Sequence, residues 1–239
     1  MAEYGGCRAC RHLFYRVYSS VDGMPTCRAF PEGIPLIIFV GNIQHTKPLP
    51  DQDNTIVYEP AEKPFWLRDP ILDFYLGQQP NSQGRAIEEI WSWDYQKLEA
   101  IHDYIQWLFP LTEKSYVNTS APTLNDRAIQ AFRTSDELRN RLIQSLKVML
   151  AFYGLECRTE ENAEIVIAKS EEYLSRSRKW IERLNHNYLR LTRILTSLTI
   201  LGLENYALAL FNCLDELYNE NKEVIGLTTY NYWKNAVNS

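Results

Sequence analysis

The sequence predicts an all-α fold, a multi-helix domain preceded by a small, Cys-rich and irregular N-terminal module. Beyond residue 69, apolar residues recur at spacings of three and four, which is the period of helices with one buried face. Residues 1–60 lack this period and hold three of the five cysteines and six of the eleven prolines. An apolar content of 45%, with 13% aromatic residues, is sufficient for a packed core. We therefore expect a module over residues 1–60, a linker over 61–68 and a helical domain over 69–239.

The N-terminal module contains one continuous apolar stretch, residues 36–40, framed by Pro35 and Gly41. Proline near the first turn and glycine after the last turn are typical of a short helix. A buried strand of the same length has the same apolar pattern, so both structures stay open for this stretch.

The helical domain is organised around one amphipathic segment, which we expect to form a continuous helix over residues 94–111. Asp94 is a favourable N-cap residue. Pro110 ends the pattern, because proline disfavours helical geometry in the residue before it. The apolar stripe between them has helical spacing and requires cover from the rest of the domain (Leu98, Ile101, Ile105 and Leu108).

The remaining helices follow from caps and periodicity. Asp69-Pro70 is expected to start a short helix over residues 71–76. Thr134-Ser-Asp-Glu137 is a capping box, and we expect the helix that it opens to end at Gly154. Apolar spacing predicts further helices over residues 85–93, 123–132, 160–180, 188–202, 205–218 and 224–237.

The N-terminal cysteines point to a metal site. Cys7, Cys10, Cys27 and His45 supply three sulfur ligands and one nitrogen ligand, a set that suits a closed tetrahedral Zn²⁺ site. An odd number of cysteines, crowded at one end, is unlike a disulfide framework. A small module with little regular structure has a marginal core, and a bound metal commonly stabilises such modules. We therefore predict one structural zinc per chain.

Alternatives to this zinc site stay open. His12 competes with His45 for the fourth position, although its closeness to Cys10 in the chain would strain the site. The cysteines could also be plain thiols, a redox pair or ligands of an iron–sulfur cluster.

Net charge and hydropathy limit the classes of partner that the sequence predicts. The formal net charge of −5 gives no reason to expect nucleic acid or an anionic membrane. No apolar run approaches the ~20 residues that span a bilayer, and the N-terminus lacks a secretory pattern. We expect a cytoplasmic protein without a membrane partner.

One stretch is nevertheless basic, and nucleic-acid binding is the alternative that it suggests. The plainer interpretation is a set of solvated helix faces with one or two buried Arg–carboxylate pairs. Its cations are Arg176, Arg178, Lys179, Arg183, Arg190 and Arg193.

An enzyme is a second alternative. His102 and His186 are the only imidazoles beyond the N-terminal module, and either could act with a nearby carboxylate. The sequence lacks the nucleophile-elbow, phosphate-loop, dinucleotide-binding and zinc-protease motifs. A non-enzymatic protein is therefore favoured, without excluding catalysis.

Several segments resemble the conserved region of opioid growth factor receptors. The first is His102-Asp-Tyr-Ile-Gln-Trp-Leu-Phe-Pro-Leu111. Met149-Leu-Ala-Phe-Tyr-Gly154, His186-Asn-Tyr-Leu-Arg-Leu-Thr-Arg-Ile-Leu195 and Leu201-Gly-Leu-Glu204 follow in the same order. The resemblance covers about residues 70–220 and implies an all-helical domain. In animals the family is associated with binding of a small enkephalin peptide.

The N-terminal module resembles a different group. Cys27-Arg-Ala-Phe-Pro-Glu-Gly-Ile-Pro35 and His45-Thr-Lys-Pro48 are similar to a small bacterial module of unknown function. Leu36 and Gln44 stand where that module usually has acidic residues. The resemblance implies a bacterial chain.

We expect a helical module that binds a peptide or a protein rather than an enzyme. Its groove is predicted between the central helix and residues 185–193. The expected ligand-binding residues are His102, Tyr104, Trp107, Phe109, His186, Asn187, Arg190 and Arg193.

Overall fold

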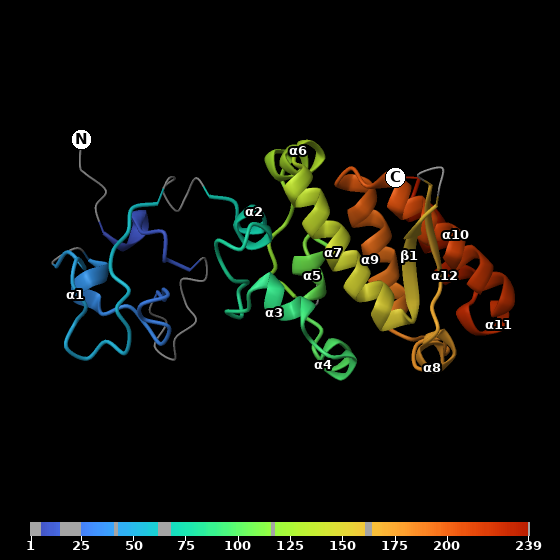
Figure 1. Ribbon diagram of the computed structural model, residues 1–239, viewed down its shortest axis with the longest axis horizontal. Coiled ribbons are helices and arrows are strands. Elements are labelled where there is room, and N and C mark those ends of the chain that lie inside the picture. The colour runs from blue at the N-terminus through green and yellow to red at the C-terminus, as the bar shows by residue number, and fades with distance from the viewer. Residues whose placement is uncertain are drawn as a thin grey trace. The chain divides into compact units, whose positions relative to one another are not determined.

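The structure, a computed structural model, describes residues 6–14, 25–40, 43–61, 68–115, 118–160 and 164–238. The chain divides into two compact units, residues 1–86 and residues 87–239. In the described residues there are twelve α-helices, one short 3₁₀ helix and one two-stranded sheet (Figure 1). The predicted all-α class is confirmed.

The N-terminal unit contains three short helical elements, η1 (Cys7–Ala9), α1 (Leu36–Phe39) and α2 (Pro70–Tyr75). The apolar stretch that sequence left open is thus a helix, with Pro35 at its N-cap. At α2, the Asp69 side chain accepts hydrogen bonds from the backbone N–H groups of Ile71 and Leu72, so this predicted start is confirmed. Most of the predicted linker, residues 62–67, lies outside the described residues.

This unit has a small core of its own. Leu13 pairs with Cys27, and Cys10 pairs with Pro60, in two isolated antiparallel bridges. The bridges place the segment of residues 10–13 between two others. Buried side chains gather around this arrangement, and they are Leu13, Cys27, Ala29, Ile34 and Ile38.

The second unit begins with α3 (Ile87–Trp91), α4 (Tyr95–Ala100) and α5 (Ile105–Leu108). The prediction of one continuous helix over residues 94–111 is therefore wrong, although Asp94 does cap α4 by accepting a hydrogen bond from Lys97 N–H. Ile101 is extended, with φ −97° and ψ 132°. The break has a tertiary cause, because the carbonyl groups at the end of α4 bond to side chains from elsewhere.

Two helices follow, α6 (Asp126–Thr134) and α7 (Asp136–Tyr153), and they pack together. The cap of α7 is Ser135, whose side chain accepts from Leu138 N–H, so the cap lies one residue after the predicted Thr134. Gly154 ends α7 as predicted, in the left-handed conformation with φ +76°.

The predicted helix over residues 160–180 is wrong. The chain instead forms a hairpin of β1 (Leu155–Thr159) and β2 (Ile165–Lys169), followed by the short α8 (Tyr173–Ser177). Ile165, Val166 and Ile167 in succession are β-branched residues that favour a strand. β1 packs on α7 and β2 packs on α10, which gives the hairpin its buried face.

The C-terminal half contains α9 (Asn187–Ile200), α10 (Glu204–Glu220), α11 (Lys222–Ile225) and α12 (Leu227–Ala236). The first two agree with the predicted helices. The last predicted helix is divided in two at Gly226, which has φ +79°. α9 packs against both α10 and α12, and Trp233 Nε1 donates to Tyr188 O at 3.1 Å between α12 and α9.

Helices that are both long and apolar enough to cross a membrane do not occur in the part of the chain that the structure describes.

Candidate functional site

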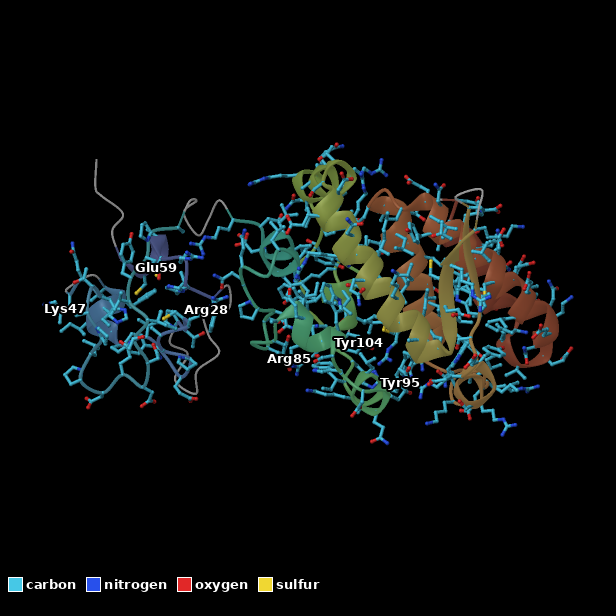
Figure 2. All side chains as sticks on the ribbon, viewed as in Figure 1. Arg28, Lys47, Glu59, Arg85, Tyr95 and Tyr104 are labelled. Atoms are coloured by element: carbon cyan, nitrogen blue, oxygen red, sulfur yellow. The ribbon has the colours of Figure 1, made fainter. Side chains whose placement is uncertain are left out.

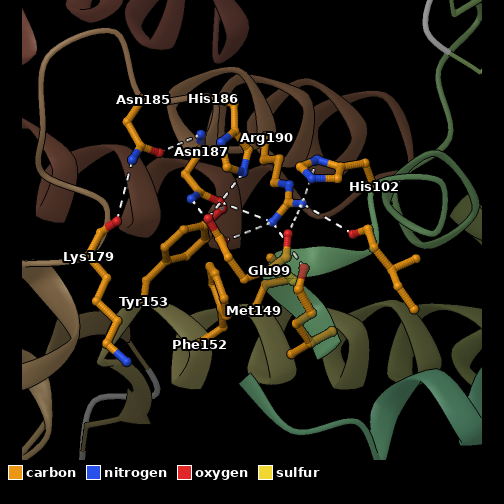
Figure 3. Close-up of polar contacts among 12 residues, drawn as sticks. Glu99, His102, Met149, Phe152, Tyr153, Lys179, Asn185, His186, Asn187 and Arg190 are labelled. Carbon is orange, nitrogen blue, oxygen red and sulfur yellow. Dashed lines mark hydrogen bonds and ion pairs between the residues drawn. The ribbon is translucent and has the colours of Figure 1, made fainter. Parts of the chain in front are cut away.

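A buried arginine joins α9 to the end of α4. Arg190 Nη1 donates to Leu98 O at 3.2 Å, and Arg190 Nη2 donates to Ile101 O at 3.3 Å. The Arg190 residue is only 5% exposed. The last carbonyl groups of a helix have no N–H partner within that helix. The Arg190 guanidinium supplies donors that a further turn of α4 would otherwise supply. Figure 3 shows this cluster.

Glu99 is the anionic centre of the same cluster. Its Oε2 lies 3.6 Å from Arg190 Nη1 and accepts from Asn187 Nδ2 at 3.3 Å. Its Oε1 lies 3.4 Å from His186 Nε2. Tyr153 OH donates to Asn187 Oδ1 at 3.4 Å, and this bond sets the orientation of the Asn187 side-chain amide. We call this set the polar network, comprising Glu99, His102, Tyr153, His186, Asn187 and Arg190.

The two imidazoles of the polar network lie side by side, with ring centroids 4.9 Å apart. Arg190 Nη2 is 3.2 Å from His102 Nδ1. Because a guanidinium only donates, Nδ1 of His102 must accept and its proton lies on Nε2. Partial burial, then the Arg190 charge, lowers the pKa of His186, while Glu99 opposes this shift. Both imidazoles are exposed, so the network reaches the surface.

The sequence-predicted ligand residues divide into two groups. His102, His186, Asn187 and Arg190 come together in the polar network (Figure 3). The three predicted aromatic residues are buried instead, with exposures of 0% for Tyr104, 2% for Trp107 and 0% for Phe109.

These buried aromatic residues support the network from the core. Tyr104 OH donates to Leu98 O at 3.1 Å, and burial raises the pKa of Tyr104 to about 12. Arg193 Nη1 donates to Phe109 O at 3.0 Å, and burial lowers the pKa of Arg193. In this conformation the aromatic side chains and Arg193 hold α5 to α9, so they offer a ligand little surface. Figure 2 labels Tyr104, inside the unit, and Tyr95 on the first turn of α4.

Beside the polar network lies a cavity of about 360 Å³, which we call the basic pocket. Arg176 forms a fixed wall, because Nε donates to Phe152 O at 3.0 Å and the guanidinium lies 3.7 Å from the Tyr95 ring centroid. Glu99 belongs to both the network and the pocket. The pocket is lined by Tyr95, Gln96, Glu99, Phe152, Arg176, Arg178, Lys179, Trp180 and Glu182.

Leu184, two residues after the pocket-lining Glu182, combines high exposure with a left-handed backbone. Leu184 is 98% exposed and has φ +60°. A left-handed backbone costs a non-glycine residue about 1–2 kcal/mol. Leu174 and Leu189, on either side in the sequence, are also exposed. The chain from α8 to α9 therefore presents three leucine side chains to solvent.

The basic stretch of residues 176–193 is not one cationic face. Arg176, Arg190 and Arg193 are occupied by the internal contacts given above, whereas Arg178, Lys179 and Arg183 are exposed. The plainer interpretation from sequence agrees with this arrangement, in which the buried Arg190 also lies beside the half-exposed Glu99. A surface with half of its cations withdrawn is a weak basis for nucleic-acid binding.

The predicted metal ligands all line one cavity of the N-terminal unit, with a volume of about 490 Å³. Burial, then the nearby Cys27 and Cys10 thiols, raises the pKa of Cys7 to about 12, so the three sulfur atoms are within electrostatic range. His45 and His12 also line the cavity, and each is 8% exposed. Among the described residues, no three His, Cys, Asp or Glu side chains stand close enough together to hold a metal ion.

Sequence reasoning missed Glu99, Tyr95, Phe152 and Leu184. Glu99 and its partner Arg190 are 91 residues apart, and no local spacing joins them. The single available signal was charge balance, since a buried arginine requires an anion or several carbonyl groups nearby.

Comparisons with known proteins identify the helical part of the chain. The family described as Opioid growth factor receptor (OGFr) conserved region matches residues 69–239. The opioid growth factor receptor of Rattus norvegicus is 40% identical over 141 residues, which is 56% of this chain and 23% of the relative. The human receptor is 41% identical over 143 residues, or 57% of this chain and 20% of the relative.

A second kind of relative is also similar. Opioid growth factor receptor-like protein 1 of Xenopus tropicalis is 41% identical over 142 residues, covering 56% of this chain and 26% of the relative. The alignments thus span about a fifth to a quarter of these relatives. No solved structure matches the chain. The similarity of residues 27–48 to a bacterial module stays a prediction. Because the family match covers more than half of the sequence, the chain belongs to the opioid growth factor receptor conserved-region family.

Proposed function

We propose that the helical unit is a non-enzymatic module that binds a peptide segment in the basic pocket. The observation that carries this proposal is a cavity lined by cationic side chains. Leu184, which is exposed to solvent, lies two residues after Glu182 in the cavity wall. Family membership supports it, since the relatives are named as receptors for a growth factor.

The chemistry of the pocket indicates the peptide. Three cations line it against two carboxylates, and Glu99 is already paired with Arg190. The exposed Arg178 and Lys179 therefore favour an acidic side chain or a terminal carboxylate. Leu184, two residues after the pocket-lining Glu182, favours an apolar residue beside it. We infer a segment that combines one acidic group with at least one apolar residue.

The strained leucine supports a binding role more than a structural one. A side chain that is 98% exposed contributes almost no burial, yet its backbone is strained. In the free protein nothing offsets the cost of this strained backbone. A partner that covers the Leu184 side chain would offset it by burying apolar surface.

Selection from a random peptide library on the full-length chain tests the proposal. We expect enriched peptides that carry an acidic and an apolar residue and bind saturably. The double variant Arg178→Glu, Lys179→Glu should weaken binding at least about tenfold, which corresponds to ~1.4 kcal/mol. The matched control is Leu208→Ser, which removes an exposed leucine on α10, and it should bind as the wild type does.

Leu184→Asn separates binding from folding. Asparagine tolerates the left-handed conformation, so the free energy of unfolding should be unchanged or rise by up to about 1 kcal/mol. Peptide affinity should fall in the same variant. The proposal is wrong if no peptide is enriched, or if the pocket variants and Leu184→Asn bind as tightly as Leu208→Ser.

A further inference from the structure

We propose that the N-terminal unit binds one Zn²⁺ through the sulfur atoms of Cys7, Cys10 and Cys27 and Nδ1 of His45, with Gln52 orienting the imidazole. This site lies in the other unit of the chain and goes beyond the peptide-binding role proposed above.

Backbone pairing brings the four ligand residues together. Cys10 bridges to Pro60 on one side, and Leu13 bridges to Cys27 on the other. Tyr58 N–H donates to His45 O at 2.6 Å, so the chain before Pro60 runs beside His45. Cys7 is joined to Cys10 by the 3₁₀ turn, in which Cys10 N–H donates to Cys7 O at 3.1 Å. Ligands from three separate segments of sequence therefore border one cavity.

The hydrogen bonds of Gln52 determine the tautomer of His45. Gln52 Nε2 donates to Ile56 O at 2.6 Å and to Asn54 O at 2.9 Å, so its amide orientation is fixed. Its Oε1 then faces His45 Nε2 at 2.8 Å and must accept. The proton of His45 lies on Nε2, and Nδ1 keeps the lone pair that a metal requires.

This pattern is the usual support of a metal-ligating histidine. Such a residue almost always donates its second ring N–H to a fixed acceptor, which orients the ring and raises its basicity as a ligand. Phe30 packs on the same ring, with centroids 5.1 Å apart, and limits its rotation further. Gln52 is thus a positioning residue for the proposed site.

His12 is the weaker candidate for the fourth position. It borders the same cavity, but Nε2 lies 3.3 Å from Glu59 Oε1, outside hydrogen-bonding geometry. His12 Nε2 thus lacks the fixed acceptor that Gln52 gives to Nε2 of His45. It also stands only two residues after Cys10, which restrains where its ring can reach.

The site forms as the ion binds. No three of these donors stand at ligating distance in the part of the chain that the structure describes, so the cysteine side chains must turn toward the ion. Each thiol releases one proton when its sulfur ligates, and His45 Nδ1 binds without losing one. Three thiolates and one imidazole then complete a closed tetrahedral shell.

Metal titration of the full-length chain tests the proposal. Elemental mass spectrometry after purification without added metal should find about one zinc per chain, and Co²⁺ should give the visible absorption of a tetrahedral thiolate site. Cys27→Ser should lose the metal and the spectrum. The matched control is Cys157→Ser, in β1, which should keep both.

Histidine and glutamine variants test the ligand assignment. His45→Gln should lower the affinity for Zn²⁺ strongly, whereas His12→Gln should leave it unchanged. Gln52→Leu should weaken Zn²⁺ binding about 10- to 100-fold while the Co²⁺ spectrum keeps its tetrahedral form. The proposal is overturned by a metal-free wild type that takes up no Co²⁺, by iron in place of zinc, or by equal loss in Cys27→Ser and Cys157→Ser. A larger loss in His12→Gln than in His45→Gln overturns the assignment of His45.

Discussion

At the scale of single residues, His186 shows how the polar network couples folding to pH. Its folded pKa is lowered below the usual 6.5 by burial and by Arg190. The unfolded chain therefore binds this proton more readily, and the free energy of unfolding falls as pH drops below about 6.5. The loss stops once pH passes below the folded pKa.

Comparing wild type with His186→Gln measures this coupling. Urea unfolding of the wild type should show lower stability at about pH 5.5 than at about pH 7.5, and the variant should lose part of that difference because glutamine does not titrate. An identical pH dependence of stability in the two proteins would show that folding does not shift the pKa of His186.

Gly154 is a residue that packing, as well as conformation, requires. A Cβ atom there would lie 2.8 Å from Tyr173 Cα and 2.9 Å from Arg176 Cβ. Gly154→Ala should cost more than the about 1–2 kcal/mol of a left-handed residue alone. Denaturant unfolding followed by tryptophan fluorescence measures this cost.

Asparagine separates the two causes at this position. Asn tolerates positive φ, so Gly154→Asn would be mild if conformation alone mattered. We expect it to be as damaging as alanine, because its Cβ meets the same backbone. Gly84→Asn is the control, since Gly84 has φ +77° but no neighbour within 4 Å, and this change should be near neutral. A mild Gly154→Asn would contradict the steric explanation.

At the scale of elements, α4 and α5 are separate helices because α9 supplies the partners for the end of α4. Arg190 binds the carbonyl groups of Leu98 and Ile101, and Tyr104 OH adds a bond to Leu98 O. The apolar stripe that predicted one helix is still buried, with Leu98 and Ile105 both in the core. The stripe therefore identifies buried positions correctly but does not determine helix continuity.

Removing this arginine should be costly. Arg190→Met removes the cation beside the half-exposed Glu99 and takes the donor from the Ile101 carbonyl group, so we expect a loss of about 1–3 kcal/mol in the free energy of unfolding. Arg183→Met, an exposed cation seven residues earlier, should stay within about 0.5 kcal/mol of wild type. Similar small effects from both variants would mean that the α4–α9 contact contributes little.

At the scale of the whole molecule, two compact units have cores of different kinds. Unit 1–86 has a small core around Cys27. Unit 87–239 has a helical core around α9. Short helices and few buried side chains give the first unit little stability of its own, which is why a bound ion would matter there.

Metal removal should therefore act locally. We expect a chelator to increase hydrogen exchange in residues 6–14, 25–40 and 43–61, while exchange in α7 and α9 stays unchanged. Equal changes in both units, or no change in the first, would contradict a structural ion in the N-terminal unit.

Much of the candidate site lay within reach of sequence reasoning. His102, His186, Asn187 and Arg190 were predicted ligand residues and do meet at one place. The predicted aromatic residues Tyr104, Trp107 and Phe109 lie in the core instead, so in this conformation they offer a ligand little surface. Residue type is visible in a sequence, but the direction of a side chain depends on which helix covers it.

By itself the sequence determined the helical class, the end of α7 at Gly154, the caps at Asp69 and Asp94, and the family. These depend on local periodicity, on short side chain–backbone bonds and on motif order, which act over a few residues. The tertiary structure alone decided the break after α4, the hairpin of β1 and β2, and the pairing of Glu99 with Arg190. Each of these satisfies buried polar groups or apolar faces with partners far along the chain, so local patterns do not determine it, even at residues 165–167, where β-branched residues favour a strand.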